Sequence, residues 1–162
     1  MRNHKWWFPA LVVLWALILF ILSSQSYEEQ SLAPLLGAFN TPFWYELFDG
    51  ISFMYGGFEV SVQTAGVAGF LEFFVRKGAH LFVFFVLGFF IFGVWSIYQK
   101  KTLVACLGAF LCVILFASTD EIHQKYTDGR TAMVQDVMID TFGGLLGILC
   151  FVFLSNRWWK RD

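Results

Sequence analysis

Four apolar segments of membrane-spanning length constrain this chain more than any other feature of its sequence. They cover approximately residues 6–22, 79–98, 102–118 and 133–154. A helix needs roughly 17 to 25 apolar residues to cross a bilayer. Composition agrees, since 58% of the 162 residues are hydrophobic, 14% are charged and the mean hydropathy is +0.65. The sequence therefore predicts an all-α membrane protein, a bundle of four transmembrane helices that forms a single domain over residues 1–162.

Lysine and arginine are unevenly distributed around these segments. Seven of the eleven precede the first segment, join the second to the third or follow the fourth: Arg2, Lys5, Lys100, Lys101, Arg157, Lys160 and Arg161. Basic residues in short flanks favour the cytoplasm, so both termini are predicted to be cytoplasmic. The net charge of -1 gives no argument for a nucleic-acid partner. A cleavable signal peptide is the alternative for residues 6–22, although this run is long for one and no clear A-x-A site follows.

The connection between residues 23 and 77 is long and rich in aromatic side chains. Six of them crowd together: Phe43, Trp44, Tyr45, Phe48, Phe53 and Tyr55. Amphipathic aromatic residues prefer the membrane interface, so we expect a short helix or re-entrant piece on the outer leaflet. A compact extracellular cap is the alternative.

Polar side chains gather at the outer ends of the second, third and fourth segments, where a bilayer should exclude them. The set is Lys77, His80, Asp120, Glu121, Gln124, Arg130, Asp136 and Asp140. An ionised carboxylate near the bilayer centre costs about 2.5 to 3.5 kcal/mol on insertion scales, so these groups need partners or protons. Their convergence from three segments predicts a binding site at the outer membrane surface. The alternative is a buried ion-pair network that only stabilises the bundle.

Helical spacing places some of these residues on shared faces. At 100° per residue, Asp136, Asp140, Gly143 and Gly147 fall within roughly a 60° arc, which should face the bundle because the glycines permit close helix contact. Residues 120–124 are predicted to continue the third helix. Asp140 lies one turn deeper than Asp136, and depth favours a protonated carboxyl that tolerates asparagine. Asp136 is therefore predicted to be the essential carboxylate.

The cluster carries more negative than positive charge. Lys77 and Arg130 face four carboxylates, which leaves about -2 if His80 is neutral. Desolvation and like charges both oppose such an excess, so either carboxylates hold protons or a divalent cation binds, with Glu121, Asp136 and His80 as candidate ligands. A turn over T-D-G-R would project Arg130, which suits a phosphate clamp. A bound metal would make water activation and phosphoryl chemistry available.

Several motifs in this order resemble the VanZ-like family of small bacterial membrane proteins. They are F-I-L-S-S-Q-S, V-R-K-G-A-H-L, D-E-I-H-Q-K-Y-T-D-G-R and Q-D-V-M-I-D-T-F-G-G-L-L-G. The family's polar motif corresponds to the eight residues of the predicted site. The chain departs from the family at Phe84, where tyrosine is frequent, at Asp128, where proline is common, and at Asp140, where asparagine is frequent.

The resemblance implies a role at the outer face of the bacterial cytoplasmic membrane. The family's founding member is an accessory factor in glycopeptide resistance that raises tolerance to teicoplanin without peptidoglycan remodelling. The resulting hypothesis is a site that binds or modifies a lipid headgroup, a polyprenyl-linked precursor or a lipophilic glycopeptide. An enzyme and a non-catalytic binder both fit this hypothesis. The sequence does not fix the oligomeric state.

Overall fold

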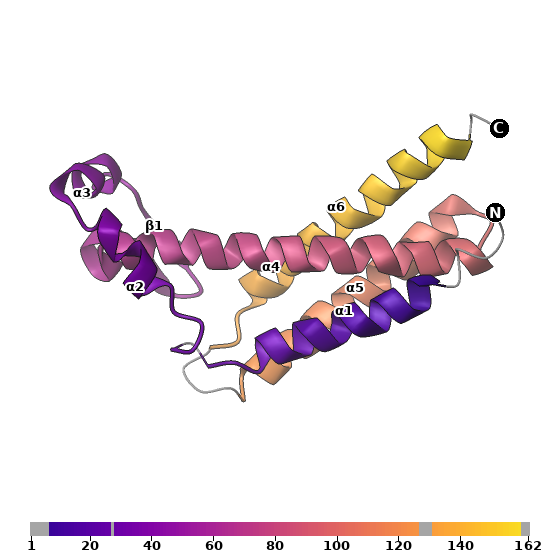
Figure 1. Cartoon of the computed structure of the whole chain (residues 1–162), viewed down its shortest axis with the longest axis horizontal. Helices are drawn as coiled ribbons and strands as arrows, with labels where there is room; N and C mark the ends of the chain where they lie inside the picture. The colour runs from indigo at the N-terminus through magenta and orange to yellow at the C-terminus, as the bar shows by residue number, and fades with distance from the viewer. Residues whose placement is uncertain (1–6, 27, 127–130, 160–162) are drawn as a thin grey trace.

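The computed structural model is mostly helical and describes residues 7–26, 28–126 and 131–159. Four longer helices make up the bundle: α1 (Trp7–Ser23), α4 (Val62–Tyr98), α5 (Thr102–Gln124) and α6 (Val134–Trp159). Helices α5 and α6 pack against α4 and against each other, and α1 lies along α4 and α5. The start of α1, the α4–α5 connection and the last turn of α6 lie at the same end of the molecule (Figure 1).

Three of these helices are long and apolar enough to cross a membrane: α4, α5 and α6 as far as Ser155. Helix α1 is apolar but shorter, with 17 residues. At 1.5 Å per residue it extends roughly 25 Å, slightly less than the hydrocarbon thickness of about 30 Å. The structure therefore confirms a helical membrane protein. It also confirms that residues 120–124 continue the third helix, which ends at Gln124.

Helix α4 begins much earlier than the apolar segment predicted from residue 79. Ser61 caps its N-terminus by accepting a hydrogen bond from the Thr64 backbone N–H at 3.3 Å. Gly66 then interrupts the helix with φ 67° and ψ 170°, a conformation that strains residues with a side chain. The helix therefore extends beyond the predicted apolar segment, because Arg76 and Lys77 interrupt the apolar run without interrupting the helix.

The residues between α1 and α4 form a compact cap at the start of α4. It contains α2 (Ala33–Leu36), a 3₁₀ turn (Gly37–Phe39), α3 (Pro42–Phe48) and a hairpin of β1 (Ser52–Tyr55) and β2 (Phe58–Ser61). Its own small core consists of Val62, Val67 and Phe70, packed against Trp44, Phe48 and Phe53 among others. The expected short helix is therefore one part of a folded cap, which Figure 1 shows at the opposite end from the α4–α5 connection.

The cap also contains one short β-hairpin, which the sequence analysis did not predict in this mostly helical protein. Its strands are antiparallel, with Phe53 opposite Val60 and Tyr55 opposite Phe58. Gly56 and Gly57 both have positive φ, 57° and 87°, which a two-residue hairpin turn of this kind requires. A β carbon on Gly56 would also collide with the Met133 sulfur atom. The hairpin turn is therefore packed against the residue that precedes α6.

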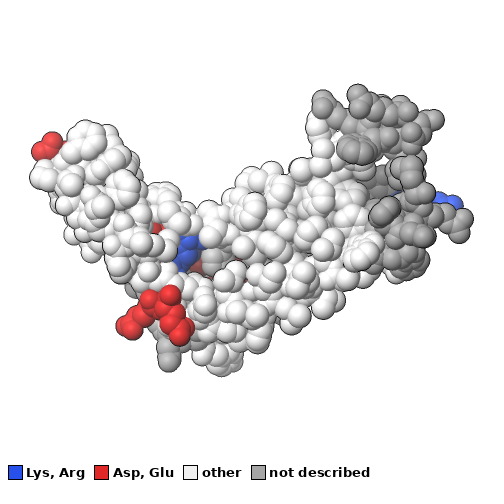
Figure 2. Space-filling model, in the orientation of Figure 1, with Lys and Arg blue, Asp and Glu red and all other residues white. Residues whose placement is uncertain are grey.

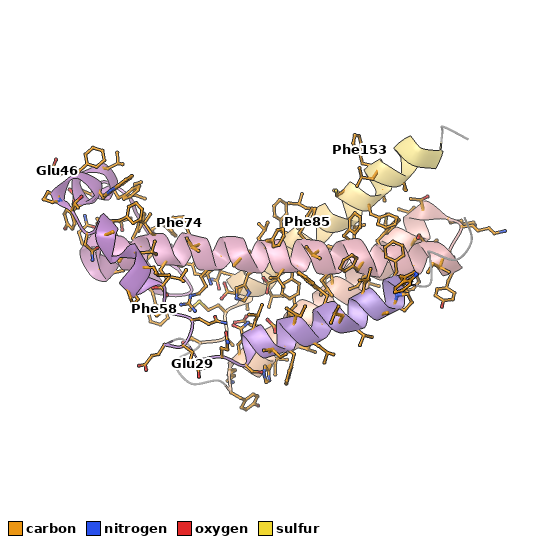
Figure 3. The ribbon with its side chains drawn as sticks, viewed as in Figure 1. Glu29, Glu46, Phe58, Phe74, Phe85 and Phe153 are labelled. Atoms are coloured by element: carbon orange, nitrogen blue, oxygen red, sulfur yellow. The ribbon has the colours of Figure 1, made fainter. Side chains whose placement is uncertain are left out.

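Glycines hold α6 against α4 at backbone distance. A β carbon on Gly143 would collide with the carbonyl oxygen of Leu81, and one on Gly147 with that of Phe85. This confirms that the stripe of Asp136, Asp140 and these glycines faces the bundle. The outer surface of the bundle is apolar: Phe74 and Phe153 are both about half exposed, at 47% and 57% (Figure 3).

Candidate functional site

The polar side chains meet where the cap joins the bundle, and they form two levels along α4 and α6. Figure 2 shows red and blue atoms near that junction, with further charged atoms at the tip of the cap and at the opposite end of the molecule, while most of the bundle surface between them is uncharged. The level nearer the cap contains Tyr55, Lys77 and Asp136 and is called the cap-side tier. The level one helical turn further into the bundle contains His80, Asp120 and Asp140 and is called the deep tier.

In the cap-side tier, Asp136 has two donors. The Lys77 ammonium donates to Asp136 Oδ1 at 2.5 Å, and the Tyr55 hydroxyl donates to the same oxygen. The ammonium also lies 4.7 Å from the centroid of the Tyr55 ring. Burial and the hydrogen bond to Asp136 raise the pKa of Tyr55 above its ordinary value near 10, so this hydroxyl stays a donor at neutral pH. The tier is a satisfied ion pair that fastens the hairpin to both helices.

In the deep tier, Asp140 lies beside a histidine and a second carboxylate. His80 Nδ1 is 3.4 Å from Asp140 Oδ1. One ligand-type atom from each of His80, Asp120 and Asp140 lies within 4.8 Å of the others. Asp140 is fully buried, at 0% exposure, and neither of its oxygens has a hydrogen-bond partner among the described residues. The deep tier therefore contains a buried acidic group whose close neighbour is a histidine and which has no hydrogen bond among the described residues.

Two neighbouring residues support the tiers from α5. Gln124 Nε2 donates to Asp120 Oδ2 at 2.8 Å, the contact expected for residues four apart on a helix. Glu121 Oε1 accepts from the Met133 backbone N–H at 2.5 Å, so it ties the end of α5 to the approach to α6. The second oxygen of Glu121 is buried without a partner among the described residues.

A cavity of about 270 Å³ opens beside the deep tier, between α1, α4 and α5. Apolar side chains form most of its wall: Leu19, Leu22, Leu32, Val75, Val83 and Phe84. Polar groups at its border include Gln30, Arg76, His80 and Asp120. Arg76 is held by Glu72 at 2.5 Å, one turn earlier on α4. His80 and Asp120 thus belong both to the deep tier and to the cavity.

The structure brings together all the predicted site residues that it describes, but in a different grouping. Arg130 and the predicted T-D-G-R turn lie outside the described residues. The predicted metal ligands Glu121, Asp136 and His80 do not form one group: Glu121 bonds to Met133 and Asp136 to Lys77 and Tyr55. Within the described ranges, the group of acids and histidine close enough to hold a metal is that of the deep tier.

Sequence reasoning missed Tyr55 and Arg76 as site residues. Tyr55 was assigned to the interfacial aromatic group, and its contact with Asp136 spans 81 positions of sequence. The sequence does carry a signal for the hairpin: a Gly56–Gly57 pair, typical of a two-residue turn, is followed by alternating apolar and polar residues over Phe58–Ser61. Arg76 stood next to Lys77 in the sequence, but only the fold shows that it borders a cavity.

Three apolar helices of spanning length around a buried group of acids and a histidine define a multi-pass helical membrane protein. The VanZ/LLP1 family model matches residues 8–155, and the chain belongs to that family. The family resemblance of the sequence motifs is thereby confirmed. No curated protein and no solved structure matches the chain.

Proposed function

We propose that this protein binds the polar end of an amphipathic envelope molecule at the outer face of the bacterial cytoplasmic membrane. The observation that carries the proposal is the cavity, whose wall is apolar and whose border holds Arg76, His80 and Asp120. Apolar walls with a few convergent polar groups are typical of ligand sites. A cavity of about 270 Å³ accommodates part of a lipid chain and the beginning of its headgroup.

An anionic phospholipid is the best-supported ligand class. Arginine is a frequent phosphate ligand, and Arg76 lines the cavity, where its Nη2 donates to Glu72 at 2.5 Å and its Nη1 to Gln30 at 3.4 Å. A polyprenyl-linked precursor presents the same combination of phosphate and apolar chain. Family membership adds a lipophilic glycopeptide such as teicoplanin as a further candidate. Binding alone and modification of the bound molecule are both consistent with this site.

The orientation and the four-span topology are part of the proposal. The start of α1 and the end of α6 lie at the same end of the bundle, as an even number of spans requires (Figure 1). The basic residues of the sequence favour that end as cytoplasmic. The cap and the cavity then face the outer leaflet.

A purely structural network is the alternative function of these polar residues. The cap-side tier fits it, because Lys77 and Asp136 form a direct ion pair. The deep tier fits it less well. His80 Nδ1 lies 3.4 Å from Asp140 Oδ1, but neither buried oxygen of Asp140 has a hydrogen bond among the described residues, and a network that serves stability leaves few buried groups unsatisfied. This difference favours a binding site at the deep tier.

The binding proposal is tested by filling the cavity. Ala79 lines the cavity, whereas a β carbon on the adjacent Gly78 meets nothing within 4 Å. Ala79→Leu should reduce crosslinking of a diazirine-bearing phosphatidylglycerol to the purified protein several-fold, and Gly78→Leu should leave it unchanged. Melting curves of both variants show whether each is folded. Equal crosslinking in folded Ala79→Leu protein would overturn the proposal.

The proposed orientation is tested by labelling in intact cells. Glu46 is exposed on α3 in the cap, and Lys100 is exposed at the α4–α5 connection. In a background without Cys106, Cys112 and Cys150, a cysteine that replaces Glu46 should react with a membrane-impermeant maleimide. A cysteine that replaces Lys100 should react only after the cells are permeabilised. The reverse pattern would place the site on the cytoplasmic side.

A further inference from the structure

Asp140 is the carboxylate of this cluster with both oxygens buried and without a hydrogen bond among the described residues, whereas Glu121 has one such oxygen. Asp136 receives hydrogen bonds from Lys77 and Tyr55, and Asp120 receives one from Gln124. The close neighbour of Asp140 is His80, whose Nδ1 lies 3.4 Å from Asp140 Oδ1 without forming a hydrogen bond. A buried carboxylate without donors is costly, so a group that completes its surroundings is expected.

The neighbours of Asp140 form a donor set for a metal ion. His80, Asp120 and Asp140 each offer a ligand atom within 4.8 Å of the other two. Tetrahedral ligands at about 2.0 to 2.2 Å from zinc are roughly 3.5 Å apart, so small side-chain rotations would bring these three atoms to a common centre. Imidazole together with carboxylates suits zinc or manganese better than calcium, which prefers oxygen ligands alone.

We propose that His80, Asp120 and Asp140 bind one divalent transition-metal ion, Zn²⁺ or Mn²⁺. Two features of the fold support a built site. Asp120 is held in place by Gln124, and the backbone contact of Gly143 with Leu81 fixes α6 beside His80. Outer contacts of this kind orient metal ligands and strengthen binding.

The open side of such a site would face a phosphate in the cavity. His80 and Asp120 line the cavity, whereas Asp140 closes the site from α6. A metal with three protein ligands keeps a coordination position for an oxygen of a bound molecule. The phosphate of a lipid can fill that position, a step that rests on the function proposed above. The metal site itself does not depend on it.

Metal binding is measured on the full-length protein in detergent. The protein is stripped with a chelator, dialysed against ZnCl₂ or MnCl₂, and examined by elemental analysis and titration calorimetry. About one ion per chain is expected. Asp140→Asn and His80→Ala should weaken binding by more than about 100-fold, beyond the 10- to 100-fold effect of changing outer contacts. Asp140→Asn nearly preserves shape, which separates a lost ligand from lost folding.

His123→Ala is the matched control. His123 lies on the same helix as Asp120, but its ring stacks on Phe20 at 4.8 Å and its Nε2 lies 3.1 Å from Ser24 Oγ. This variant should bind the metal like the unmodified protein. Metal binding that is lost in His123→Ala and retained in His80→Ala would overturn the proposal. A folded protein that binds neither Zn²⁺ nor Mn²⁺ would also overturn the proposal.

The phosphate step is separated by repeating the lipid crosslinking with and without metal. Stronger crosslinking of the phosphatidylglycerol probe to metal-loaded protein, lost in Asp140→Asn, is the expected result. A bound ion with no influence on crosslinking would refute the phosphate step and leave the metal site standing. Crosslinking that depends on Ala79 in a protein without any ion would refute the metal site and leave lipid binding standing.

Discussion

The two tiers of the polar cluster are built from the same two helices, yet they differ in how completely their charges are satisfied. Asp136 is 14% exposed and bonded to Lys77 and Tyr55. Asp140, four residues later on α6, is fully buried without a hydrogen-bond donor among the described residues. The difference teaches that position on a helix face does not determine role. The cap-side tier connects parts of the structure, whereas the deep tier borders a cavity.

The neighbours of each tier explain this difference. The cap-side tier meets the hairpin, which supplies the Tyr55 hydroxyl and closes the space around Asp136. The deep tier meets a cavity, so Asp120 and His80 have room beside them that no side chain fills. A polar residue packed against other protein groups can be satisfied by them. One that borders a cavity is free to contact a ligand.

The variant with the largest expected effect should disrupt both tiers together. Gly147→Leu would place a side chain against the Phe85 carbonyl oxygen and force α6 away from α4. Overpacking usually costs about 1 to 3 kcal/mol, and a collision with backbone should reach at least the upper end of that range. The expected result is loss of the monodisperse, folded protein in detergent and loss of any metal and lipid binding.

Gly78→Leu is the control for this variant because its side chain enters open space on α4. It should express and melt like the unmodified protein. If Gly147→Leu also melts normally, the glycine contact does not set the distance between α4 and α6.

Two variants with smaller expected effects change the cap-side tier alone. Lys77→Met leaves the Asp136 carboxylate with one donor and should lower the free energy of unfolding by roughly 2 kcal/mol, because a partly buried charge loses its partner. Tyr55→Phe removes one hydrogen bond and should cost about 1 kcal/mol. The apparent melting temperature in detergent reports both changes.

These cap-side variants should leave metal binding at the deep tier within about threefold of the unmodified protein, which is less than the 10- to 100-fold effect of changing outer contacts of a metal. Loss of metal binding in Tyr55→Phe as large as that in Asp140→Asn would show that the two tiers act as one unit.

The sequence predicted the parts of this fold that depend on local patterns. Apolar length located three helices of spanning character, and the predicted continuation of the third helix over residues 120–124 is what brings Asp120 and Gln124 one turn apart. The glycine stripe of α6 was also predictable, because small residues at this spacing indicate close helix contact. In each case the evidence lies within one helix.

Features that depend on contact between distant segments could not be predicted in the same way. Asp120 and Glu121 are adjacent, so they point about 100° apart on α5, and only the packing of α5 decides which one joins the deep tier. Tyr55 reaches Asp136 through a hairpin whose position the sequence does not specify. The prediction that Asp140 is protonated rested on its depth alone. It did not consider that Asp120 lies close to Asp140, an arrangement in which a metal ion could neutralise the carboxylates instead of a proton.

The glycine contact between α4 and α6 also determines the dimensions of the site. Because Gly143 and Gly147 meet carbonyl oxygens of α4, main-chain atoms set the distance between α4 and α6 at these two positions. The distance between His80 on α4 and Asp140 on α6 can therefore vary only slightly. Substitutions among the apolar residues on the outer surface of the bundle should leave this distance unchanged, whereas one added methyl group at either glycine would collide with the α4 backbone and widen it.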